Sequence, residues 1–322
     1  MRILLLILFA ASGCSALIYE IVWFQLLTLA IGSTAVSLAF LLAAFMGGLC
    51  IGSIGFARLR IASSPLRIYA LLELGIGICG ILVLAGIPVV GRVYVAAAAH
   101  GLPSMFLRGF IAALCMLPPT ILMGASLPAI VRQLEGAPEA VSWWGFLYGG
   151  NTAGAVFGCL LAGYYLLRIY NTAIATYVAV AINLGVALVS FTVSRGPLGQ
   201  ALSAVNPEFS ASRSRLPASI LIAIGLSGAT ALGAEVVWTR LLGMMLGSTV
   251  YVFSVILAVF LTGLALGSAA GSWVARRTRN AALALGASQL LLVIAIGWTA
   301  YMIADSLPYW NASPLLTAGP WQ

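Results

Sequence analysis

The chain has 322 residues, of which 62% are hydrophobic and only 7% are charged. Soluble globular domains carry about 25% charged residues, so this composition excludes a soluble fold. The formal net charge is +8, yet every basic residue is Arg and most lie between apolar runs. This distribution indicates membrane topology rather than a nucleic-acid-binding surface. We therefore expect an all-α polytopic membrane protein whose environment is the lipid bilayer, with no nucleic-acid partner.

Apolar runs of about 20 residues, long enough to cross a hydrocarbon core about 30 Å thick, recur along the chain. Their limits predict six helices, at 3–31, 33–57, 66–91, 105–131, 143–167 and 172–193. A polar cytoplasmic linker at 194–216 is expected next. Three further helices follow at 217–246, 248–275 and 281–304, and then a periplasmic tail at 306–322. The first region, residues 1–193, thus has six predicted helices, and the second region, residues 217–305, has three, which makes about nine in total.

The distribution of Arg predicts the orientation of these helices. With the N-terminus inside, eleven Arg fall on the cytoplasmic side and only Arg92, Arg108 and Arg168 fall outside, while Arg240 lies within a helix. This asymmetry follows the positive-inside rule. We expect an integral protein of a bacterial inner membrane, with a cytoplasmic N-terminus and a periplasmic C-terminus.

An ungapped internal repeat relates residues 12–60 to residues 227–275. The two copies share the motif Ser-Gly-x-x-Ala-Leu-x-x-Glu-x-Val-Trp, and later a Gly-Ser-Thr triplet. Six predicted helices separate the two starts, so both copies enter the membrane in the same direction. Such a parallel repeat is typical of the halves of major facilitator transporters. In this register the second half is incomplete, which predicts either a missing C-terminal region or a partner subunit that completes the bundle.

The repeat nominates Glu20 and Glu235 as candidate ligand-binding residues. Ionisable side chains inside a bilayer are costly and usually face a cavity or a partner. Each Glu precedes a Trp by three residues, as Glu20/Trp23 and Glu235/Trp238, so the carboxylate and the ring share a helix face. A carboxylate beside an aromatic ring suits a cation. The alternative is that each Glu is protonated or hydrogen-bonded to a neighbouring helix.

Three other polar residues fall within predicted helices. Glu73 is a candidate for ligand binding, packing or pairing, and Asn151 could line a polar cavity. Arg240 either extends to the outer interface or pairs with an acid across the bundle. Gly150, Gly154 and Gly158 predict a groove for close helix packing, and the prolines of the fourth helix are expected to interrupt it.

The sequence predicts no catalytic residues, no cofactor and no metal. There is one His and one Asp in the chain, so a His-based triad and a multi-His metal site are both excluded. The segment 75–80 fits the dinucleotide-binding pattern G-x-G-x-x-G, but it lies within an apolar helix and follows no strand.

The motifs resemble the membrane region of spermidine synthase-like transmembrane proteins, the fused major facilitator/spermidine synthase family. The resemblance rests on segments 12–23, 32–34, 45–49, 119–128 and 147–154. It implies a connection with polyamines and association with an aminopropyltransferase-like domain, whose acidic site residues are not found in this sequence. The Asp-Arg pair typical of major facilitator inner loops is also not found after Gly52 or Gly267.

Three functions remain open at this point. The first is a transporter-like module that binds or moves a small cationic compound at Glu20 and Glu235. The second is a non-transporting scaffold or anchor subunit of a larger membrane complex. The third is membrane-tethered aminopropyl transfer, which requires a further domain.

Overall fold

The computed structural model describes residues 2–32, 35–59, 64–100, 104–133, 140–196, 218–247, 249–278 and 280–306. Within these ranges all regular structure is helical, and nine helices are long and apolar enough to cross a membrane. They are α1 (Arg2–Ile31), α2 (Ala35–Arg58), α3 (Pro65–Ala99), α4 (Ser104–Arg132), α5 (Ala140–Leu160), α7 (Thr172–Arg195), α9 (Ala218–Leu246), α10 (Val250–Arg277) and α11 (Ala281–Tyr301). The chain is therefore an integral membrane protein with polytopic α-helical architecture, as the composition predicts.

Two of the helices continue into π-helical segments. The π-helical segment η1 (Leu161–Leu166) and the single turn α6 (Leu167–Ile169) prolong α5, and η2 (Met302–Ser306) prolongs α11. The predicted tail beyond residue 306 and nearly all of the predicted linker lie outside the described residues.

The predicted interruption of the fourth helix is wrong. α4 runs without a break from Ser104 to Arg132, although it contains Pro118, Pro119 and Pro128. In a bilayer a broken segment would expose backbone groups that water cannot reach, so neighbouring helices and hydroxyl groups hold proline-containing helices together. Directly after Pro118 and Pro119, the hydroxyl of Thr120 donates to the carbonyl oxygens of Met116 at 2.6 Å and Leu117 at 3.2 Å.

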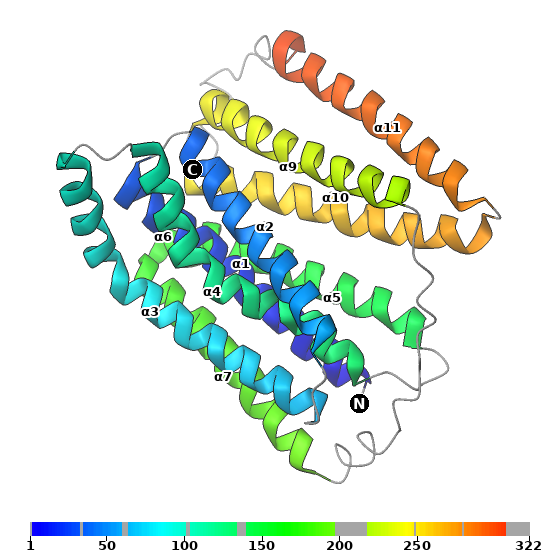
Figure 1. Cartoon of the computed structure of the whole chain (residues 1–322), viewed down its shortest axis with the longest axis horizontal. Coiled ribbons are helices and arrows are strands. Elements are labelled where there is room, and N and C mark those ends of the chain that lie inside the picture. Colours follow the sequence, from blue (N-terminus) through cyan, green and yellow to red (C-terminus); the bar gives the residue numbers. More distant parts are fainter. Residues whose placement is uncertain are drawn as a thin grey trace, which may run out of the picture.

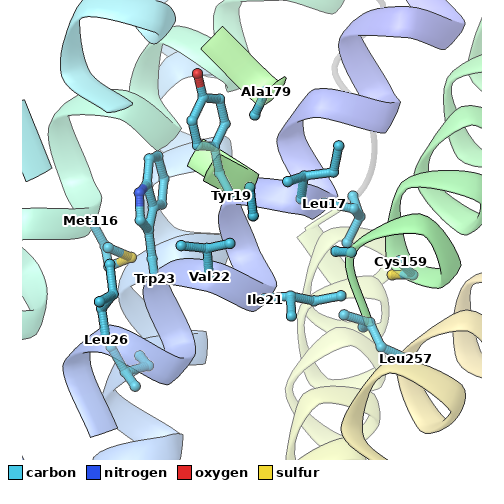
Figure 2. Close-up of a cluster of buried hydrophobic side chains, with 14 of the residues drawn as sticks. Leu17, Tyr19, Ile21, Val22, Trp23, Leu26, Met116, Cys159, Ala179 and Leu257 are labelled. Carbon is cyan, nitrogen blue, oxygen red and sulfur yellow. The ribbon is translucent and has the colours of Figure 1, made fainter. Parts of the chain in front are cut away.

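α1 is the central helix of the first region. It packs against α5 and α7, while α2 pairs with α4, and α3 contacts both α4 and α7 (Figure 1). Figure 2 shows the resulting core, in which Trp23 of α1 points toward Met116 of α4, and Ile21 lies near Leu257 of α10. Side chains from separate regions of the chain thus share one apolar core.

The predicted glycine groove on α5 is confirmed. A Cβ atom at Gly154 or Gly158 would collide with the backbone of α1 at Ala10 or Cys14. Gly13 of α1 lies equally close to Asn151 of α5. The absence of side chains at these glycines therefore lets the two backbones approach.

The helices of the second region are much less enclosed. In the most apolar 18-residue window of each helix, 72% of residues are buried in α1, 6% in α9 and 0% in α11. α10 joins this region to the first by packing against α5. α11 lies at the edge of the molecule, beyond α9 and α10 (Figure 1).

The two sequence copies share a local backbone feature. α1 and α9 run in the same direction (Figure 1), and each ends at a glycine with positive φ, Gly32 at 91° and Gly247 at 95°. Residues with side chains rarely adopt this conformation, which explains glycine at both helix ends.

Candidate functional site

Glu20 lies at the centre of the bundle. Its side chain is 7% exposed, and it lines a void of only about 10 Å³ together with side chains of α2, α4 and α10. A void of this size is close to the minimum that holds one water molecule. Its Oε1 atom has no hydrogen-bond partner among the described residues. The structure therefore places a polar atom of Glu20 in apolar surroundings with almost no free space.

Glu235 is the one buried residue of α9 among those described there. It is 4% exposed, and its Oε2 atom also has no hydrogen-bond partner within the described part of the chain. Since α9 is otherwise largely exposed, this inward-facing carboxyl group is exceptional on its helix. It marks the side of α9 that faces the first region.

Glu20 and Glu235 are both buried, and each has an oxygen atom without a described hydrogen-bond partner. They come from equivalent positions of the sequence repeat, one on α1 and the other on α9. Two carboxylates in a medium of low dielectric constant repel each other strongly. A cation or a proton between them would remove this repulsion, so the pair has the chemistry of a cation or proton site.

The two predicted Trp residues differ in their surroundings. Trp23 is fully buried and stacks on Tyr19, with ring centroids 4.8 Å apart and an interplanar angle of 21°. Trp23 points toward Met116 of α4 in Figure 2, and the ring of Tyr19 lies against Gly80 of α3. Trp238 is only partly buried. The aromatic ring near Glu20 is therefore part of the packed core.

Glu73 has hydrogen-bond partners for both of its oxygens. Ser12 of α1 donates to Oε1 at 2.6 Å, and Asn183 of α7 donates to Oε2 at 2.7 Å. The side chain is completely buried. These bonds join three helices, which favours the pairing role over ligand binding for Glu73.

Asn151 connects α5 to α1. Its Nδ2 atom donates to the carbonyl oxygen of Phe9 at 2.9 Å, beside the close contact with Gly13. The amide group thus satisfies a backbone carbonyl at a close helix interface, and this contact favours a packing role.

A cavity of about 310 Å³ opens between α1, α9 and α10. The sequence analysis did not predict it. Its lining includes Gln25 and Arg240, which occupy equivalent positions of the repeat, and the ring pair Phe24 and Phe253. These two rings stack at 4.3 Å and also line the small void beside Glu20. The repeat did contain a signal for this cavity. Five residues after each paired Glu, the first copy has Gln25 and the second copy has Arg240.

Comparison with family models, with curated proteins and with solved structures gave no match.

Proposed function

We propose that this protein is a transporter-like membrane module that binds a small cationic compound between Glu20 and Glu235. The observation that carries the proposal is the burial of two carboxyl groups at equivalent repeat positions, each with an oxygen that has no partner among the described residues. A compound with one or more ammonium groups would supply both hydrogen-bond donors and positive charge. The resemblance to spermidine synthase-like membrane regions makes a polyamine the first compound to test.

The arrangement around the pair supports movement of a ligand. Glu20 belongs to the first region and Glu235 to the second, so a shift of one region against the other would change the space between the carboxyl groups. In major facilitator transporters ligands bind near the midplane, between two halves that rock against each other. The void of about 10 Å³ beside Glu20 fits a closed form of such a site.

The test is the double variant Glu20→Gln/Glu235→Gln, reconstituted in liposomes. We expect it to lose binding and uptake of radiolabelled spermidine, because Gln retains the shape of Glu but not its charge. Variant Glu208→Gln, with the same type of change in the predicted linker, is the control and should behave like wild type. Unchanged spermidine binding and uptake in the double variant would refute the proposal.

A second candidate is a scaffold or anchor subunit, and it rests on the open face of α10. A Cβ atom at Gly263 or Gly267 meets no described atom within 4 Å, whereas equivalent positions Gly48 and Gly52 of α2 are closed by α4. An additional helix, from a partner subunit or from the same polypeptide, would fit against α10 in the same way. Stoichiometric co-purification of a partner that depends on Gly267, without spermidine binding, would favour this function.

The remaining expectations extend the first proposal. An aminopropyltransferase-like domain would act on the cytoplasmic side if such a domain accompanies this membrane region. The bacterial inner membrane, with the N-terminus in the cytoplasm and the C-terminus in the periplasm, is the location that the Arg distribution supports.

A further inference from the structure

The cavity between α1, α9 and α10 has a mixed lining. Its walls are formed mainly by aliphatic and aromatic side chains, and its polar members are Gln25, Thr28, Thr239, Arg240 and Thr249. Of the described residues that line it, Arg240 is the only charged one. Its volume of about 310 Å³ falls at the lower end of the range for small-molecule sites.

The position of Arg240 makes an anionic partner favourable. Arg240 stands six residues before the end of α9 at Leu246, which is about 9 Å along the helix axis. A charged side chain inside a bilayer is costly unless a polar cavity or an opposite charge compensates it. A bound anion would supply such an opposite charge.

The N-terminus of α10 also favours negative charge in this cavity. Its first turn borders the cavity through Val250 and Val252, which places the positive end of the helix dipole there. The side chain of Gln25 lines the cavity as well, and the NH2 group of an amide side chain is a hydrogen-bond donor for an anion.

The repeat shows that this charge is a specific addition. Four equivalent pairs line the cavity, Phe24/Thr239, Gln25/Arg240, Thr28/Gly243 and Leu38/Phe253. The cavity thus lies between matching parts of the two copies. Of the pair Gln25/Arg240, only the residue of the second copy is charged. The first copy has glutamine at this position, which makes Arg240→Gln the substitution to test.

We propose that this cavity binds an amphipathic monoanion, whose carboxylate or phosphate group contacts Arg240 and whose hydrocarbon part lies against Phe24 and Phe253. This site is distinct from the cation site at Glu20 and Glu235, and it requires no transport. The predicted topology places it near the outer surface, because α9 ends and α10 begins on that side.

The test measures binding of decanoate to the full chain in neutral detergent, with decanol as the uncharged probe. Arg240→Gln is expected to weaken decanoate binding at least tenfold and to leave decanol binding unchanged. Arg277→Gln, which removes an equal charge from a side chain stacked on Trp273, is the matched control and should bind both probes as wild type does. Unchanged decanoate binding in Arg240→Gln, or an equal loss of both probes, would overturn the proposal.

A second variant tests the cavity independently of the charge. Thr28→Phe fills part of the space and retains Arg240, so both probes should bind more weakly, and unchanged binding of both would also contradict the proposal. Nanodiscs then separate two sources of the anion. If phosphatidylglycerol, compared with phosphatidylcholine, weakens decanoate binding to wild type but not to Arg240→Gln, the occupant is a lipid headgroup; equal binding in both lipids identifies a soluble amphiphile.

Discussion

Glu73 illustrates how one carboxyl group can organise a membrane core. Its two oxygens accept hydrogen bonds from Ser12 and Asn183, so a single side chain joins α1, α3 and α7. In apolar surroundings, loss of one partner leaves a polar atom without compensation.

We predict that Asn183→Ala lowers the free energy of unfolding by about 1–3 kcal/mol, because it removes a donor from a buried oxygen of Glu73. Thr192→Ala on the same helix is the control. Its side chain is exposed and its hydroxyl bonds only to Val189 of its own helix, so the expected cost is below about 0.5 kcal/mol. Unfolding by sodium dodecyl sulfate in mixed micelles measures both values. Equal losses in the two variants would contradict a structural role for the bond to Glu73.

The candidate site could be predicted from the sequence only where the repeat marked it. Glu20 and Glu235 stood out because the same motif surrounds both, and both side chains are buried in the structure. The partners of Glu73 could not be predicted in this way. They lie 61 and 110 residues away, and their approach depends on how three apolar helices rotate about their axes. A helix that is hydrophobic on all sides has no polar face, so its sequence says little about which side faces its neighbours.

At the level of single helices, α2 and α10 form a natural comparison. Both carry glycines at the same positions of the repeat, but the glycines of α2 are covered by α4 and those of α10 meet no described side chain or backbone. The close contact of Gly52 is with the backbone oxygen of Ile121, which cannot move aside without shifting α4. The same residue type therefore has different structural roles in the two copies.

We predict opposite effects for Gly52→Ala and Gly267→Ala. Both substitutions raise intrinsic helix propensity by about 1 kcal/mol. Only Gly52→Ala forces a new atom into the backbone of α4, and overpacking of this kind costs about 1–3 kcal/mol. Gly52→Ala should therefore be destabilising and Gly267→Ala neutral or stabilising, as measured by the same unfolding experiment. Destabilisation by Gly267→Ala would show that another helix covers α10 in the membrane.

The limits of the helices were predictable because long apolar runs end at Gly, Pro and Arg. The errors came from the helix breakers: proline was expected to interrupt the fourth helix, and the third was expected to end near residue 91. In the structure α3 continues past Pro88 to Ala99, and α4 contains three prolines. Rules from soluble proteins overestimate the effect of proline here, since a bilayer offers no water to the freed backbone groups.

At the scale of the whole molecule, composition alone predicted a membrane protein with about nine spans, and the structure confirms this architecture for the described residues. The packing of the second region against the first was not predictable from composition. It depends on a few contacts, of which the stacked rings of Phe24 and Phe253 are one, and most of the surface of α9 and α11 remains exposed. The direction in which the helices cross the membrane is a separate question, and it depends on the distribution of Arg.

The predicted orientation can be tested with a matched pair of asparagines. Asn171 and Asn280 are both exposed, and each caps a helix by accepting a hydrogen bond from a backbone N–H three residues later, at 2.9 and 3.1 Å. Replacement by Cys should therefore cost each helix a similar amount, about 1 kcal/mol. The Arg distribution places Asn171 outside and Asn280 inside. In intact cells a membrane-impermeant maleimide should label Asn171→Cys above the wild-type background and label Asn280→Cys only after permeabilisation, whereas the reverse pattern would invert the topology and place the Arg240 cavity on the cytoplasmic side.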